Sequence, residues 1–146
     1  MTIARPALDD MLAHAHEVRP RECCGLLIGA GTAILRSVRA RNLAEQPTRY
    51  LVDPADHVRA LRDARASGVE VLGFYHSHPG SEAVPSPTDL AEASYPECVY
   101  LILGVRQGQS DVRLFRFRDG KADEVPMTVS GDSLSRSRCR RPGFGW

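Results

Sequence analysis

The segment 69–78 most constrains the fold, because it predicts a central strand between two helix starts. Each helix start pairs a capping side chain with a proline at the first helical position. These pairs are Asp53-Pro54 before the segment and Ser86-Pro87 after it, and the second helix is predicted over residues 87–95. The central strand therefore ends shortly before a helix N-terminus.

The rest of the chain adds one more helix and several strands. Apolar residues recur at helical spacing over residues 6–18, and Pro20 ends that helix. Short apolar or alternating runs, several bounded by glycine, predict the strands, and the first two form a hairpin. The predicted strands are 24–29, 33–39, 49–52, 98–105, 111–117 and 125–129.

Length and charge exclude several classes of protein. A chain of 146 residues fits one domain, since about 100–200 residues per domain is usual. The net charge of +1 gives no global attraction to nucleic acid or to a membrane. No apolar run approaches the ~20 residues of a membrane span, and the N-terminal segment lacks the apolar core of a signal peptide. We therefore expect a cytoplasmic protein.

The last residues predict a flexible basic tail, which limits the folded domain to residues 1–129. Residues 130–146 are rich in Ser, Arg and Gly, and they carry four arginines against Asp132, a net charge of +3. The tail is interpreted as solubilising, with attraction to an acidic partner or to nucleic acid as the alternative.

His76 and His78 are the first candidate metal ligands. Residues two apart in a strand face the same side of the sheet, so the two imidazoles project together. Asp89 follows at the start of the next helix, where the intervening loop can bring it back to the histidines. Three protein ligands with a fourth position open describe a catalytic zinc. Spacing alone leaves open a stacked histidine pair and an ordinary helix cap.

Glu22 is the candidate general base that a zinc hydrolase needs in addition to its ligands. It lies just before the N-terminal end of the apolar strand 24–29, where partial desolvation raises the pKa of a carboxyl group. The alternative is a solvated residue at a strand edge. Cys23 and Cys24 are interpreted as small buried apolar residues, and a disulfide between Cys24 and Cys98 cannot be predicted from the sequence.

Taken together, these residues resemble the motif of the JAMM family of zinc metalloproteases, which carry the JAB/MPN domain. The family motif is Glu, then His-(Ser/Thr)-His-Pro, then Ser-x-x-Asp. In this chain it corresponds to Glu22, His76-Ser77-His78-Pro79 and Ser86-Pro87-Thr88-Asp89. The strand that begins Cys24-Gly25-Leu26-Leu27, together with Asn42 and Arg49-Tyr50, is also similar to the stand-alone prokaryotic members. The resemblance runs from about residue 3 to residue 129.

The resemblance implies a single-domain α/β fold of the cytidine-deaminase-like type, with a mixed sheet flanked by helices. It implies that His76, His78 and Asp89 bind Zn²⁺, with a water as the fourth ligand. Glu22 would act first as base and then as acid. Ser86 would hydrogen-bond the water or the oxyanion of the tetrahedral intermediate.

The resemblance also implies a substrate class. The enzyme would hydrolyse the peptide or isopeptide bond that follows the C-terminal Gly-Gly of a ubiquitin-like or sulfur-carrier protein, with no nucleic acid or membrane as partner. The alternatives are a non-catalytic protein-binding module of the MPN type and a zinc amidohydrolase that acts on another peptide. The sequence specifies neither the individual substrate nor the oligomeric state.

Overall fold

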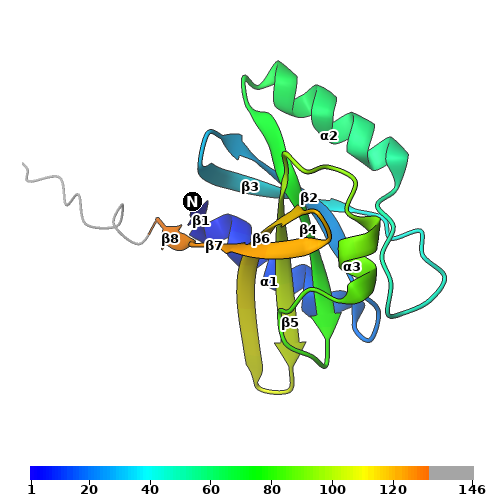
Figure 1. Ribbon diagram of the computed structural model, residues 1–146. Coiled ribbons are helices and arrows are strands. Elements are labelled where there is room, and N and C mark those ends of the chain that lie inside the picture. Colours follow the sequence, from blue (N-terminus) through cyan, green and yellow to red (C-terminus); the bar gives the residue numbers. More distant parts are fainter. Residues whose placement is uncertain (132–146) are drawn as a thin grey trace, which may run out of the picture.

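One curled, mixed sheet of eight strands carries the fold of residues 1–131, the part of the chain that this computed structural model describes (Figure 1). The strand order is β7-β6-β5-β4-β2-β3-β1-β8. The predicted single-domain α/β fold with a mixed sheet is confirmed. The elements are β1 Thr2–Ala4, α1 Arg5–Val18, β2 Cys24–Ala30, β3 Ala33–Ala40, α2 Pro54–Ala66, β4 Glu70–Pro79, α3 Pro87–Glu92, β5 Val99–Arg106, β6 Gln109–Arg118, β7 Lys121–Val125 and β8 Thr128–Ser130.

Alternating side chains of the central strands build a core on each face of the sheet. Leu27, Tyr75 and Leu101 belong to the core that includes the buried residues of α1. Their chain neighbours Leu26 and Phe74 belong to the core that includes the buried residues of α2. Since neighbouring residues of a strand face opposite sides, α1 and α2 cover opposite faces of the sheet. Within residues 1–131, no helix has the length and apolar character that a membrane crossing requires.

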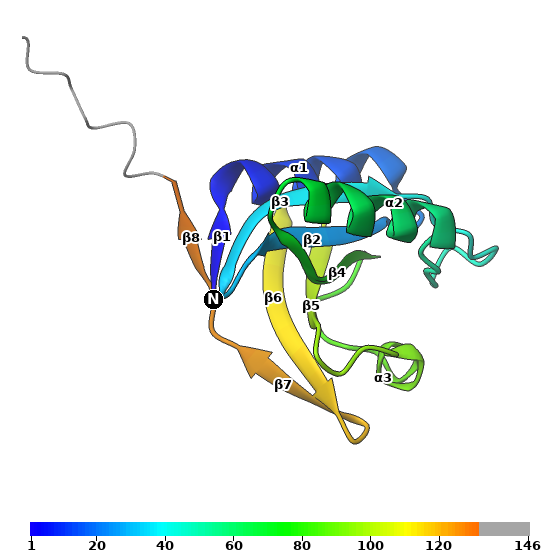
Figure 2. The ribbon, with the colours of Figure 1, turned by 90° about the horizontal axis from the view of Figure 1, so that it is seen from above.

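Strand β4 lies near the middle of the sheet and determines where the candidate site forms. It runs antiparallel to β2 and parallel to β5. A parallel pair needs a long crossover connection, and residues 80–98, which include α3, provide it. This connection carries α3 past the carboxyl end of β4, the end that holds His76 and His78. Figure 2 shows α3 apart from α1 and α2.

Two predicted elements are wrong in extent or kind. Residues 49–52 form no strand. The Leu51 N–H donates to the side-chain oxygen of Asn42 at 2.9 Å, and backbone pairing is limited to an isolated bridge between Asn42 and Val52. The helix predicted over 87–95 ends at Glu92, because Ala93 adopts an extended conformation.

The C-terminal strands also differ from the prediction. Asp119 and Gly120 both have positive φ, 51° and 70°, so they form a tight hairpin turn and the next strand begins directly at Lys121. The strand predicted over 125–129 is therefore two strands, β7 and β8, separated at Pro126. Strand β8 reaches Ser130, one residue past the predicted domain boundary, and residues 132–146 of the predicted tail lie outside the described part. The three-residue β1 was missed.

Cys23, Cys24 and Cys98 are free thiols, so no disulfide joins Cys24 to Cys98. Cys23 and Cys24 are 2% and 0% exposed. Burial raises the pKa of Cys23 to about 11 and that of Cys24 to about 12, so neither is a reactive thiolate near neutral pH. Their interpretation as small buried apolar residues is confirmed.

Ser77, between the two histidines, ties β4 to the segment that precedes β2. Its hydroxyl oxygen accepts a hydrogen bond from the Cys23 N–H at 2.8 Å, and its own N–H donates to the Cys23 carbonyl at 3.1 Å. Ser77 is fully buried. This pairing holds Glu22, the neighbour of Cys23, beside the histidine strand.

We expect Ser77→Ala to lower the free energy of unfolding by about 1–3 kcal/mol, because the buried Cys23 N–H loses its side-chain acceptor. Urea denaturation of the metal-free protein measures the change. Ser110→Ala, at an exposed position of β6, is the matched control and should stay within about 0.5 kcal/mol of the wild type. Equal effects of the two substitutions would contradict the prediction.

Candidate metal centre

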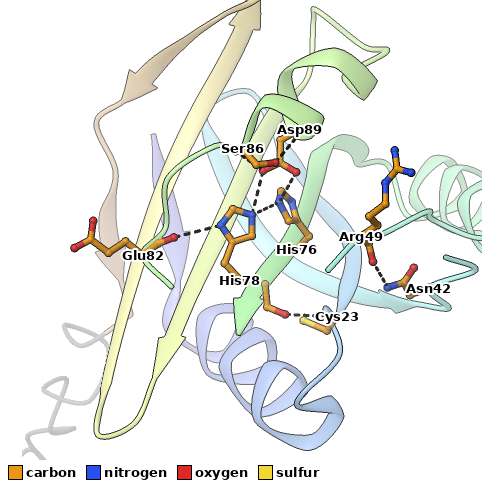
Figure 3. A network of polar contacts seen from close by, with 9 residues as sticks. Cys23, Asn42, Arg49, His76, His78, Glu82, Ser86 and Asp89 are labelled. Carbon is orange, nitrogen blue, oxygen red and sulfur yellow. Dashed lines mark hydrogen bonds and ion pairs between the residues drawn. The ribbon is translucent and has the colours of Figure 1, made fainter. Parts of the chain in front are cut away.

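The structure brings the three predicted ligands together at the end of β4. The Nε2 atoms of His76 and His78 lie 3.1 Å apart. Asp89, in the first turn of α3, places Oδ1 at 3.2 Å from His76 Nε2 and Oδ2 at 3.1 Å from His78 Nε2 (Figure 3). All three side chains are buried, with residue exposures of 0%, 8% and 7%.

The geometry of this group fits a tetrahedral cation. Zinc ligands at roughly 2.0–2.1 Å from the ion stand about 3.3 Å apart along the edges of a tetrahedron. The observed separations of 3.1–3.2 Å are close to that value. Two imidazole nitrogens that face each other at this distance need a shared proton or a shared cation between them. Two nitrogens and one carboxylate suit Zn²⁺ and leave a fourth position open.

Ser86 fixes the position of Asp89 through a capping box. The Ser86 hydroxyl oxygen accepts from the Asp89 N–H at 3.0 Å, and the Ser86 N–H donates to Asp89 Oδ2 at 2.9 Å. The predicted roles of Ser86 as N-cap and of Pro87 as first helical residue are confirmed. Because the Ser86 hydroxyl acts as an acceptor here, its own proton is free to be donated to another group.

The charges of the site favour ionised Asp89. Burial alone would raise the pKa of Asp89, but hydrogen bonds from His76 and His78 hold it well below its usual range. Burial lowers the pKa of His76. For His78, burial also acts to lower the pKa, but the hydrogen bond and charge of Asp89 outweigh it and the net shift is upward. A positive charge between these groups is therefore stabilised.

Glu22 lies at the edge of this group with a carboxyl that prefers to be neutral. Its residue is 7% exposed. Desolvation raises the pKa of Glu22 to about 7, and the negative charges of Asp89 and Glu92 add to it against the opposing effect of His78. Its Oε2 is buried and has no hydrogen-bond partner among residues 1–131. A carboxylate that titrates near neutrality can exchange protons with a bound water.

Asn42 was singled out by resemblance alone, and the structure gives it a role. Its side-chain amide donates to the carbonyls of Glu22 and Arg49, each at 3.0 Å, and its oxygen accepts from the N–H groups of Ala44 and Leu51. All four hydrogen-bonding positions of the amide are therefore used. The loop 42–52 is thereby attached to the backbone of Glu22. Figure 3 shows the hydrogen bond from Asn42 to the Arg49 carbonyl.

Two contacts of the site were not foreseen. The ring of Tyr50 stacks on His76, with centroids 4.1 Å apart. The backbone carbonyl of Glu82 accepts from His78 Nδ1 at 3.2 Å. The sequence carries no signal for either, because one depends on how the loop 42–52 folds back and the other on a main-chain atom.

An apolar cavity of about 290 Å³ adjoins the site. Tyr50 forms part of its wall and so separates it from His76. Arg49 and Glu92 form an ion pair that joins the loop 42–52 to the end of α3 at its rim. The other apolar lining residues include Leu51, Val52, Phe74, Tyr95 and Tyr100.

Residues 4–118 match the family of prokaryotic homologs of the JAB domain. The chain belongs to this family. Within it, the chain is 41% identical over 111 residues to a desampylase of Haloferax volcanii, covering 70% of this chain and 78% of that protein. It is 30% identical over 132 residues to the CysO-cysteine peptidase of Mycobacterium tuberculosis, covering 88% of this chain and 90% of that protein.

A solved structure supports the same assignment. A protein of Desulfitobacterium hafniense, solved in solution, superposes with a TM-score of 0.81 at 31% identity, covering 88% of this chain and 92% of that one. Because the chain belongs to this family and its relatives are named as a desampylase and a peptidase, this JAB-domain protein is a metallopeptidase of the JAMM type, as the sequence predicted.

The raised pKa of Glu22 predicts a specific pH dependence of stability. A group whose pKa rises on folding contributes stability that is present below its unfolded pKa of 4.5 and is lost as pH rises through about 7. Glu22→Gln removes this titration. For metal-free protein, we therefore expect the stability of Glu22→Gln relative to wild type to increase by about 2–3 kcal/mol between pH 4.5 and pH 8.

Urea denaturation at the two pH values measures this difference. Glu70→Gln, at an exposed position of β4, is the control and should show no such pH-dependent gap. A gap for Glu22→Gln that stays constant between pH 4.5 and pH 8 would contradict a buried, neutral-leaning carboxyl.

Proposed function

We propose that this protein is a zinc-dependent peptidase or isopeptidase that hydrolyses the amide bond after the C-terminal Gly-Gly of a ubiquitin-like or sulfur-carrier protein. The observation that carries the proposal is the buried group of His76, His78 and Asp89 with a desolvated Glu22 beside it. The relatives named desampylase and CysO-cysteine peptidase support the substrate class. A cytoplasmic location stays a prediction.

In this proposal His76, His78 and Asp89 hold the zinc ion. A bound zinc ion supplies Lewis-acid chemistry, which activates water and polarises the scissile carbonyl. Glu22 accepts the proton of the attacking water and then donates it to the leaving amine, and a pKa near 7 suits both steps. The Ser86 hydroxyl donates a hydrogen bond to the oxyanion of the tetrahedral intermediate.

The shape of the site supports a slender substrate segment. The loop between β4 and α3 is short, Tyr50 stacks on His76, and Tyr50 and Glu92 of α3 both line the adjoining cavity. A Gly-Gly terminus has no side chains at the two positions nearest the scissile bond, so it needs the least space beside Tyr50 and the histidines. The apolar cavity beside Tyr50 is then available to residues further along the tail.

Two substitutions separate metal binding from proton transfer. We expect Glu22→Gln to keep one zinc per chain while turnover falls by about 10²–10⁴-fold, because the base is lost and the ligands remain. His78→Ala should lose the zinc and the activity together. Metal analysis and kinetics of the purified proteins measure both quantities. His16→Ala, exposed on α1, is the control and should resemble the wild type; turnover by Glu22→Gln at the wild-type rate would exclude Glu22 as the base.

The substrate class is tested with a carrier protein. A small β-grasp protein ending in Gly-Gly and extended by one further residue is incubated with the zinc-loaded enzyme, and intact mass is measured. Loss of the extension alone is expected, with no change in the presence of Glu22→Gln. A wild-type enzyme that holds zinc and leaves every such carrier intact would refute the substrate class and favour a non-catalytic binding module or an amidohydrolase of other peptides.

A further inference from the structure

The tautomer of His78 is set by one carbonyl in the loop after β4. His78 Nδ1 donates to the Glu82 carbonyl at 3.2 Å, which turns Nε2 toward Asp89 and His76 (Figure 3). Nε2 donates to Asp89 in the metal-free protein and is the nitrogen that would bind a cation once its proton is displaced. A metal-ligating histidine needs this arrangement, in which the other ring nitrogen is held by an acceptor. The position of the Glu82 carbonyl therefore controls how well His78 can act as a ligand.

The same peptide group that holds His78 is itself held by Asp111. The carbonyl of Glu82 and the N–H of Ala83 belong to one planar peptide unit and point in opposite directions. The Ala83 N–H donates to Asp111 Oδ2 at 3.0 Å. A continuous chain of hydrogen bonds thus runs from the Asp111 carboxylate through this peptide group to the ring of His78. A charged acceptor at one end polarises the peptide group and strengthens its carbonyl as an acceptor at the other.

The sheet register explains why this bridge fits. His78 of β4 pairs with Gly104 of β5, and Gly104 pairs with Asp111 of β6, so the three residues form one row across the sheet. Gly104 has no side chain to occupy the space between the other two. A Cβ atom there would lie 2.2 Å from Asp111 Oδ1, 2.6 Å from the Ala83 nitrogen and 2.8 Å from the Glu82 carbonyl carbon. The bridging peptide group therefore lies directly over the glycine.

Further contacts attach the loop to the same strands. The Gly80 N–H donates to the Val105 carbonyl at 2.7 Å, and Ala83 is fully buried. Asp111 Oδ1 is also buried and has no hydrogen-bond partner among residues 1–131. A buried carboxylate oxygen without a partner is destabilising. We therefore interpret the hydrogen bond between the other oxygen and Ala83 as important for the position of the loop.

We propose that Asp111 is a positioning residue for the metal ligand His78, acting through the peptide group between Glu82 and Ala83 over the gap left by Gly104. The inference rests on the proposed zinc-binding role of His78. Asp111 touches neither metal nor substrate in this scheme, and its effect is on the orientation and tautomer of the imidazole.

The first test measures zinc affinity by competition with a chromophoric chelator. Asp111→Val cannot accept a hydrogen bond but suits a strand, and it should weaken zinc binding by about 10–100-fold. Asp111→Asn keeps an acceptor oxygen and should recover binding to within about threefold of wild type. Asp123→Val, the same substitution at an exposed position of β7, is the matched control and should bind zinc as the wild type does.

The second test uses the metal-free protein, and its wild-type and Asp111→Asn measurements do not depend on the folding of Asp111→Val. A wild-type His78 that lacks the proton on Nδ1 would by itself overturn the inference. Histidine ¹⁵N chemical shifts report which ring nitrogen carries the proton. The wild type and Asp111→Asn should show His78 protonated at Nδ1, and the tautomers should become mixed in Asp111→Val. Wild-type zinc affinity in Asp111→Val, or an unchanged tautomer, would overturn the inference. A wild-type protein that shows the Nδ1–H tautomer but binds no zinc would refute the proposed function and leave the positioning of the ring intact.

Discussion

The parallel pairing of β4 with β5 is the constraint on which the candidate site depends. It forces the chain to cross over before it can return to the sheet, and the crossover carries α3 past the carboxyl end of β4. The histidines of β4 and the aspartate of α3 meet for this reason. The short connection limits how far α3 can lie from the strand, and the capping box of Ser86 and Asp89 fixes the remaining freedom.

Burial shifts the pKa values of the carboxyl groups at this site. The Asp89 carboxylate stays ionised because two imidazoles donate to it, while desolvation raises the pKa of Glu22 and favours its neutral form. Two carboxyl groups that interact electrostatically thus have pKa values shifted in opposite directions. Asp89 can serve as a permanent anion for a cation, and Glu22 can take up and release a proton near neutral pH. The difference arises from hydrogen-bond donors, which Asp89 has and Glu22 Oε2 lacks within the described residues.

The sequence predicted the elements that carry strong local signals. The helix starts at Asp53-Pro54 and Ser86-Pro87 follow from capping chemistry, and the shared face of the two histidines of β4 follows from strand periodicity. It could not predict the loop 42–52, because Asn42 replaces regular backbone pairing with side-chain hydrogen bonds. The bridge from Asp111 to His78 also escaped prediction, since it depends on register across three strands and on a main-chain carbonyl.

The central claim is that one zinc ion is held by His76, His78 and Asp89, with Glu22 outside the ligand set. Anomalous diffraction at the zinc absorption edge from crystals of the zinc-loaded protein tests it most directly. The account predicts one strong peak within bonding distance of both Nε2 atoms and of an Asp89 carboxylate oxygen. A peak bonded to Glu22, or zinc bound elsewhere on the chain with this group empty, would contradict it.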